Sequence, residues 1–215
     1  MRKNPKISIV DYGVGNLGSL INTFKYCGCA IRLTTRSKTI AESDAIILPG
    51  DGSFKSGMQG LKARRLVGAV KEFSESKKPI LGICLGAQIM MTSGYEFGKS
   101  NGLDLISGKV VKFPKLAQAV KIPHIGWGAI YNGEDWNRTI LDSVKNGSEV
   151  YFVHSYVLDV KQKNDILAKS TYGGIEFVSV VKRNNIYGCQ FHPEKSGSVG
   201  LQIIKNFIDL VANEN

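Results

Sequence analysis

One cysteine lies where a buried strand is expected to end and a helix to begin. In residues 77–91, KKPILGICLGAQIMM, Cys84 follows an apolar run and stands between Gly82 and Gly86. A bend of this kind, with small residues around it, exposes one side chain above a sheet and is called a nucleophile elbow. The N–H groups at the helix start would favour the thiolate, the nucleophilic form. A lone cysteine is more often a core residue, so this interpretation needs support elsewhere in the chain.

A negative charge that develops beside Cys84 during a reaction would need hydrogen-bond donors. The N–H of Leu85 is the first candidate. The turn PGDG, residues 49–52, would bring a second donor from Asp51 or Gly52, because glycines let the backbone face a ligand. One such donor typically contributes about 100- to 1,000-fold to turnover.

A cysteine nucleophile also needs a base, and the base needs a group that orients it. The segment QFHPE supplies both after the last expected strand: His192 and Glu194 are separated only by Pro193, which stiffens the turn. Glu194 would fix the imidazole tautomer, and His192 would take the thiol proton and later deliver a proton to a leaving amine. The three side chains together predict nucleophilic attack on an amide.

Two other patterns have simpler interpretations. Gly13, Gly15 and Gly18 have the spacing of a dinucleotide fingerprint, but the next strand ends in Arg36 where an acidic residue is usual, so a tight turn is favoured. The segment YCGC, residues 26–29, resembles half of a metal site, yet no second Cys or His pair accompanies it. Gly28 there is expected to end a helix. We expect no cofactor and no metal.

The expected elements place these residues at one edge of a sheet. Continuous apolar strands over 6–11, 30–35, 44–50 and 79–84 alternate with helices over 16–28, 58–77 and 85–94. Strands at short spacing follow over 108–114, 148–159, 165–174, 176–183 and 186–191, before a helix over 200–212. The pattern predicts an α/β fold: a mostly parallel central sheet flanked by helices, with an antiparallel extension, in one domain over residues 1–215.

Composition sets the expected environment. The chain has 215 residues, 43% of them apolar, and no run long enough to span a membrane, so a cytoplasmic protein is predicted. The net charge is +10, and residues 1–80 hold 14 of the 28 Lys and Arg but 6 of the 18 Asp and Glu. Since no basic run is interleaved with aromatic residues, a solvated surface is favoured over a nucleic-acid site, and an acidic protein partner stays open.

The chemistry-bearing segments resemble the class I, or triad, glutamine amidotransferases, which have a flavodoxin-like fold. GICLGAQ is similar to their nucleophile elbow and FHPE to their His–Glu segment. The resemblance implies that Cys84, His192 and Glu194 form a triad that hydrolyses glutamine to glutamate and ammonia through a thioester. It further implies that Gln88 binds the glutamine and that Gly50 and Gly52 belong to the oxyanion strand.

The segments DYGVGNLGS, LPGDGSF, PHIGWG, YFVHSY and FHPEKS resemble, in order, the glutaminase subunits of imidazole glycerol phosphate synthases. In this family a separate cyclase of (β/α)₈ barrel fold receives the ammonia for histidine biosynthesis. The resemblance implies a heterodimer in which Asn16, Trp127 and Lys195 lie on the face that meets the barrel. Ser155 and Tyr156 would lie beside the bound glutamine.

Two positions depart from the pattern of this family. Asp51 stands where an apolar residue is usual, and Gly128 stands where an asparagine usually follows the tryptophan. Neither belongs to the triad. They leave open an alternative: a paralogous glutaminase subunit that supplies ammonia to a different acceptor, such as a sugar of a surface polysaccharide.

Overall fold

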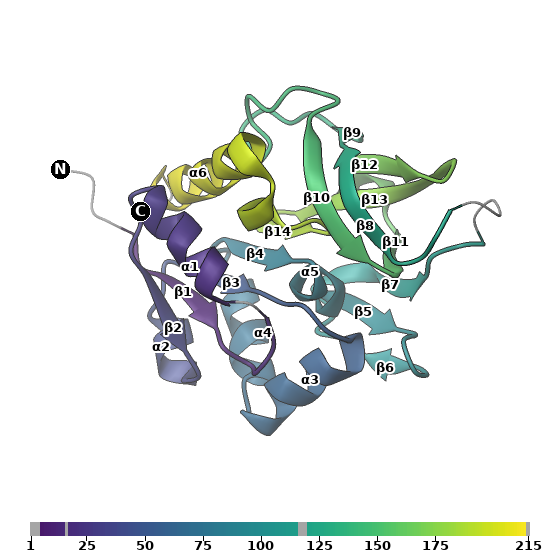
Figure 1. The fold of residues 1–215 in the computed structure, drawn as a ribbon. Coiled ribbons are helices and arrows are strands. Elements are labelled where there is room, and N and C mark those ends of the chain that lie inside the picture. The colour runs from purple at the N-terminus through teal and green to yellow at the C-terminus, as the bar shows by residue number, and fades with distance from the viewer. Residues whose placement is uncertain (1–4, 16, 116–119, 214–215) are drawn as a thin grey trace.

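A row of parallel strands forms the centre of the fold. The computed structural model describes residues 5–15, 17–115 and 120–213 (Figure 1). The parallel strands lie in the order β2-β1-β3-β4-β14. Their bounds are β1 Ile7–Val10, β2 Ile31–Thr34, β3 Ala45–Leu48, β4 Ile80–Ile83 and β14 Ile186–Cys189. All of these except β2 are buried along their whole length, as continuous apolar strands covered on both faces should be.

A largely antiparallel extension continues the same sheet beyond β14. Its order is β13-β11-β7-β5-β6, and β12 pairs with β13 and with β9, so that twelve strands of the described residues form one sheet. Their bounds are β5 Met91–Gly94, β6 Ser100–Asn101, β7 Ile106–Lys112, β9 Tyr131–Asn132, β11 Tyr156–Val160, β12 Ile166–Tyr172 and β13 Ile175–Arg183. The predicted α/β fold with an antiparallel extension is confirmed.

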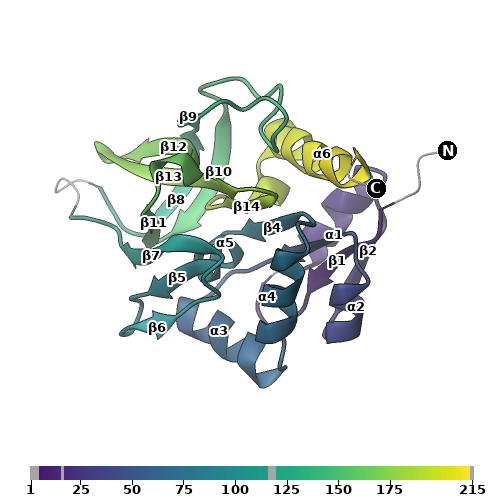
Figure 2. The same ribbon diagram turned by 180° about the vertical axis from the view of Figure 1, so that it is seen from behind.

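Helices cover both faces of the parallel strands. α1 (Leu17–Tyr26) and α6 (Gly197–Asn213) pack on one face, in a cluster that includes Ala45 and Ile47 of β3. α2 (Ser37–Ala41), α3 (Phe54–Ala63) and α4 (Val67–Glu75) pack on the other, with Ile46 and Leu48 (Figure 2). Successive residues of β3 therefore face opposite layers, which is the two-residue period of a strand buried on both sides.

A separate two-stranded ribbon lies over the α6 side of the sheet. It pairs β8 (His124–Ala129) with β10 (Glu149–His154) in antiparallel register, and Val150 and Phe152 of β10 pack into the same cluster as α6. β8 is absent from the predicted elements because HIGWGA contains two glycines in six residues, which is atypical of a strand. The short helix α2 is likewise absent from them.

Three predicted elements have different bounds. The helix expected over 58–77 is two helices: Arg65 adopts a left-handed φ of 57°, and the N–H of Leu66 folds back onto the carbonyl of Leu61. The helix expected over 85–94 ends early as α5 (Leu85–Ile89), and the chain continues as strand β5. The strand expected over 148–159 breaks at Ser155 into β10 and β11, which belong to different sheets.

Gly86 allows α5 to pack directly on β3. A Cβ atom at Gly86 would overlap with the carbonyl oxygen of Leu48, which is main chain and cannot rotate away. We expect Gly86→Ala to lower the free energy of unfolding by about 2–3 kcal/mol, as overpacking typically does. Urea denaturation followed by circular dichroism measures this loss.

Gly68 in α4 is the matched control, because a Cβ there meets nothing within 4 Å. Gly68→Ala should stabilise the protein by about 0.5–1 kcal/mol, the usual gain from replacing glycine in a helix. Equal effects of the two substitutions would contradict the packing argument.

Candidate active site

Cys84 lies at the end of β4, in a backbone conformation that neither a strand nor a helix contains. Its φ and ψ are 50° and −106°, and its N–H donates to the carbonyl of Cys189 at the end of β14 (2.7 Å). Gly82 makes the bend possible, since a Cβ there would lie 2.8 Å from the Ala87 nitrogen and from Gly86. A non-glycine residue held at positive φ is strained and is characteristic of functional sites. The predicted elbow is confirmed.

The His192 ring is fixed by its neighbours on the turn after β14. Its Nδ1 lies 2.8 Å from Oε1 of Glu194, and both side chains are nearly buried. The main-chain N–H of His192 donates to the carbonyl of Tyr151 in β10 (2.9 Å), and the Ser196 hydroxyl donates to the main-chain carbonyl of His192 (2.6 Å). The structure thus brings Glu194 to the position from which it orients the imidazole.

Cys84 and His192 line one cavity and interact electrostatically with each other. Burial alone would lower the pKa of His192, but its hydrogen bond to Glu194 and its interactions with the charges of Cys84 and Glu194 outweigh burial and raise this pKa to about 10. A proton transferred from the thiol is therefore held on His192 at neutral pH. The three residues have the arrangement of nucleophile, base and orienting group.

A polar network that the sequence interpretation missed lies below the thiol. Gln190 is fully buried, and its Nε2 lies 3.8 Å from Sγ of Cys84. Its Oε1 accepts from Nε2 of Gln88 (3.1 Å), which also donates to the carbonyl of Tyr156 (3.4 Å). The available signal was a glutamine directly after a buried strand and two residues before the histidine.

A cavity of about 300 Å³ opens at the thiol. It gathers most of the predicted site residues: Asp51, Gly52, Cys84, Gln88, Ser155, Tyr156, His192 and Lys195. Glu96 and His154, which the sequence interpretation did not select, also line it. Glu96 is held by the N–H of Phe54 at the start of α3, which donates to Oε2 (2.7 Å). The cavity therefore has a thiol, amide and hydroxyl groups, and the two acidic residues Asp51 and Glu96 on its wall.

The first of the predicted oxyanion donors, the N–H of Leu85, is already engaged in this structure. The N–H of Leu85 donates to the carbonyl of Gly50 (3.3 Å), so a carbonyl oxygen occupies the place where an anion would bind. The turn that carries Gly50 is braced by the hydroxyl of Tyr12, which donates to the Pro49 carbonyl. Gly15 packs against the same turn, where a Cβ would come within 3.2 Å of Gly50 Cα. The glycines after β1 thus serve a tight turn, as predicted.

The residues predicted to meet a partner lie on or near the β8–β10 ribbon. Trp127 is 54% exposed and Ile125 is 58% exposed, both on β8, and the Trp127 ring packs edge-on against Tyr151 (5.9 Å). Lys195 is exposed and lines the cavity. Asn16 lies outside the described residues.

Comparison with known proteins agrees with this geometry. The family model of glutamine amidotransferase class-I matches residues 8–210. The chain belongs to the class-I glutamine amidotransferases. Imidazole glycerol phosphate synthase subunit HisH 1 of Legionella pneumophila (strain Paris) is 46% identical over 210 residues, covering 95% of this chain and 99% of that protein. The amidotransferase fold is also found in a solved structure titled PurLQS, from Thermotoga maritima, with a TM-score of 0.68 and 17% identity over 99% of this chain and 99% of that chain.

A second relative comes from another organism. The imidazole glycerol phosphate synthase subunit HisH of Caldanaerobacter subterraneus subsp. tengcongensis is 42% identical over 205 residues, covering 95% of this chain and 98% of that protein. The predicted membership in the triad amidotransferases is confirmed.

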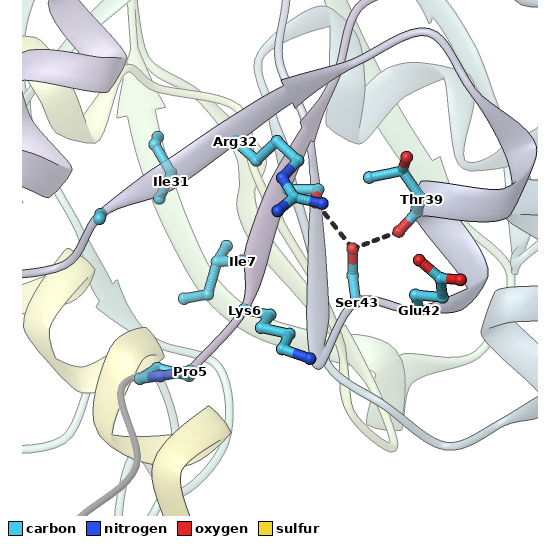
Figure 3. Close-up of a pocket in the computed structure, with 10 residues that line it drawn as sticks. Pro5, Lys6, Ile7, Ile31, Arg32, Thr39, Glu42 and Ser43 are labelled. Atoms are coloured by element: carbon cyan, nitrogen blue, oxygen red, sulfur yellow. Dashed lines mark hydrogen bonds between the residues drawn. The ribbon is translucent and has the colours of Figure 1, made fainter.

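The amidotransferase has another hollow, of about 530 Å³, at the opposite edge of the sheet (Figure 3). Lys6 and Arg32 line it, near the starts of β1 and β2. Its buried hydroxyls are already engaged: those of Ser8 and Ser43 share a hydrogen bond (2.7 Å), and Ser43 donates to the Thr39 carbonyl (2.7 Å). Because it lies at the amino ends of the strands, it takes no part in the triad chemistry.

Across the parts of the chain that the structure covers, no three His, Cys, Asp or Glu side chains are grouped so that they could hold a metal ion. None of the described helices of the amidotransferase is both long and apolar enough to cross a membrane.

The two remaining histidines of the amidotransferase form a buried pair, of which His154 also lines the cavity. Nδ1 of His124 lies 3.1 Å from Nε2 of His154, whose Nδ1 donates to the Tyr156 carbonyl (2.9 Å). The His124 ring is stacked between Tyr172 and Phe152. Burial lowers the pKa of His124 to about 4, and burial, outweighing the bond to Tyr156, lowers the pKa of His154 to about 4.

We expect the three histidines to titrate in two separate ranges. His192 should stay protonated until the pH approaches 10, whereas His124 and His154 should stay neutral down to about pH 4. Stability from His192 is therefore complete below about pH 6.5 and is lost as the pH rises toward 10, while the buried pair lowers stability as the pH falls from about 6.5 to 4. Imidazole ¹H–¹⁵N NMR spectra resolve the three rings.

Glu194→Gln tests the cause. It removes the charge but keeps the shape, so the His192 transition should move to lower pH while the other two rings are unaffected. An unmoved His192 transition would contradict the role given to Glu194.

Proposed function

We propose that this chain is the glutaminase subunit of an imidazole glycerol phosphate synthase, which hydrolyses glutamine to glutamate and ammonia and passes the ammonia to a cyclase subunit in histidine biosynthesis. The observation that carries the proposal is the placement of Cys84 beside His192, which is hydrogen-bonded to Glu194, at a cavity of about 300 Å³, a size suited to a small molecule. Relatives of 39–46% identity over 95% of the chain, all named as HisH subunits, support it.

The geometry supports a two-step reaction. The Cys84 thiolate attacks the carbon of the glutamine side-chain amide, and the proton held by His192 passes to the departing nitrogen, which leaves as ammonia. A thioester to Cys84 remains. Water, deprotonated by His192, then attacks the thioester, the C–S bond breaks, and glutamate is released. Glu194 binds Nδ1 throughout both steps and so keeps the other ring nitrogen, Nε2, available for the proton transfers.

The walls of the cavity match the groups of a glutamine molecule. Gln88, Ser155 and Tyr156 offer amide, hydroxyl and main-chain groups, and Gly52 brings the main chain of the turn to the cavity edge, while Gly50 lines a smaller hollow. Glu96 adds a carboxylate that the predicted set lacked, and its charge suits the α-ammonium group of the substrate. Glutamine would then lie with its amide carbon at Cys84.

The turn at residues 49–52 explains how a partner would control the reaction. Turnover needs the Gly50 carbonyl to move away, so that the Leu85 N–H can donate to the oxyanion, with Asp51 or Gly52 contributing the second donor. Gly52 has a φ of 115°, a conformation that favours glycine and lets the turn change its path. Asp51 is exposed, so its carboxylate is placed to meet solvent or a basic group of the partner.

The partner would be a cyclase of (β/α)₈ fold, bound over the β8–β10 ribbon. Exposed aromatic anchors such as Trp127 are typical of interface centres, and the exposed Lys195 would lie on the same face. We further propose that residues 1–215 form one amidotransferase domain, which the continuous sheet supports, and that the enzyme is cytoplasmic and binds neither nucleic acid nor membrane.

The alternative acceptor, a sugar of a surface polysaccharide, rests on Asp51 and Gly128 alone. Gly128 faces the ring of Phe152, 3.2 Å from where its Cβ would lie, so this position is shaped by packing in the ribbon as well as by any partner. The relatives' names favour the histidine pathway.

Glutaminase activity tests the proposal directly. Because the Leu85 N–H is occupied, the isolated chain should release glutamate about 100- to 1,000-fold more slowly than the chain with the cyclase and its ligand. Cys84→Ala should reduce turnover by about 10⁴-fold or more in both cases. A coupled glutamate assay measures both rates.

Two outcomes would contradict this proposal. Undiminished turnover in Cys84→Ala would refute the triad. No stimulation by the cyclase, with normal triad activity, would favour a different acceptor.

Substituting Trp127 tests the docking face. Trp127→Ala should weaken cyclase binding by about 30-fold or more, the loss of an interface anchor, with no effect on basal turnover. Tyr26→Ala is the control, since Tyr26 is 76% exposed on α1, outside the ribbon. Titration calorimetry gives both dissociation constants, and equal affinities would remove Trp127 from the interface.

A further inference from the structure

The sulfur of Cys84 has a second polar neighbour besides the imidazole. Nε2 of Gln190 lies 3.8 Å from Sγ, within the longer reach of hydrogen bonds to sulfur. Gln190 follows β14 directly and is fully buried, so no bulk water competes with this contact. We propose that Gln190 is a further catalytic residue, whose amide N–H stabilises negative charge on the Cys84 sulfur; this proposal rests on the proposed function.

The orientation of the Gln190 amide is fixed by its other end. Its Oε1 accepts from Nε2 of Gln88 (3.1 Å), so the oxygen cannot turn toward Cys84 without losing that bond. The main chain is fixed as well, because the Gln190 N–H donates to the Ser179 carbonyl (2.9 Å). The amide N–H is therefore held toward the sulfur before any substrate binds.

The other close neighbour of the sulfur makes such a donor necessary. The carbonyl of Val153 lies 3.7 Å from Sγ, where it accepts a hydrogen bond from the neutral thiol. Once the thiol is ionised, this carbonyl dipole repels the charge. The Gln190 N–H and the His192 ring then offset the repulsion, and both side chains are buried, which strengthens such interactions.

The charge on sulfur appears twice in the reaction. It is present before attack on glutamine, and it returns when the thioester C–S bond breaks and the electron pair goes back to sulfur. A donor placed at the sulfur favours both states. The Gln190 Oε1 also accepts from Nε2 of Gln88, which donates as well to the Tyr156 carbonyl, so the amide at the sulfur is tied to a residue of the cavity wall.

The experiment measures thiol reactivity rather than glutamine turnover. The full-length chain is treated with iodoacetamide between pH 5 and 10, and Cys84 modification is followed by peptide mass spectrometry. The other three thiols are distinguished by position and by chemistry, because burial raises the pKa of Cys27, Cys29 and Cys189. Gln190→Met removes the N–H without adding charge or much volume.

We expect Gln190→Met to slow Cys84 alkylation at pH 7 by about 10- to 100-fold, the range for a hydrogen bond to a charged group. The pH of half-maximal rate should rise by at least one unit, with the same maximal rate at high pH. Ser179→Ala is the matched control: it alters a buried hydroxyl with no partner among the described residues, on the strand that pairs with β14. Its alkylation profile should equal that of the unsubstituted chain.

An unchanged profile in folded Gln190→Met would overturn the inference, because loss of packing alone lowers stability without moving a titration. If that variant does not fold, Gln190→Asn replaces it: the side chain is one methylene shorter, so its amide N–H lies farther from the sulfur. The same alkylation profile decides the outcome. If Cys84 of the unsubstituted chain reacts with iodoacetamide at pH 7 no faster than a small free thiol, the proposed triad fails instead. The two failures are thus distinguishable.

Discussion

The parallel pairing of β4 with β14 is the constraint on which the site depends. It joins segments about a hundred residues apart in the chain, and the last bond of the ladder runs from the Cys84 N–H to the Cys189 carbonyl. Because both strands end at the same edge, the residues that follow them, Gln190 and His192, arrive beside the sulfur without long loops. A parallel sheet buried on both faces holds this edge rigid, so that the distances among the catalytic groups are set by the core.

The elbow shows how packing maintains a strained residue. Cys84 is held at positive φ, which costs on the order of 1–3 kcal/mol. The surrounding contacts leave no relaxed alternative: Gly82 and Gly86 let α5 lie against β4 and β3 so closely that any side chain there would overlap with the main chain. The stability of the buried strands thus maintains a conformation that aims the thiol at the cavity. The same closeness places the Leu85 N–H within reach of the Gly50 carbonyl, and the site rests with its oxyanion donor occupied.

Most features that depend on residues close together in the chain were predicted from the sequence. The apolar strands, the elbow and the pairing of His192 with Glu194 depend on neighbouring residues, and they appear as expected. Contacts between distant segments were missed: Glu96 comes to the cavity from the β5–β6 hairpin, and Gln190 acts through a side chain buried in the sheet. The break at Ser155 was missed because both halves have the same strand-like composition, and only the tertiary structure assigns them to different sheets.

A continuous polar path connects the thiol to the surface proposed for the partner. From the sulfur it runs through the amides of Gln190 and Gln88 to the Tyr156 carbonyl, and from there through His154 to His124. His124 begins β8, the strand that presents Trp127 outward. Because both histidines are buried and neutral, each of their hydrogen bonds requires one tautomer of the ring. If β8 shifted, no bulk water would be at hand to replace a hydrogen bond that was lost. A partner that moves the ribbon would therefore change the geometry at the sulfur through the same groups that position glutamine, in addition to any effect on the turn at residues 49–52.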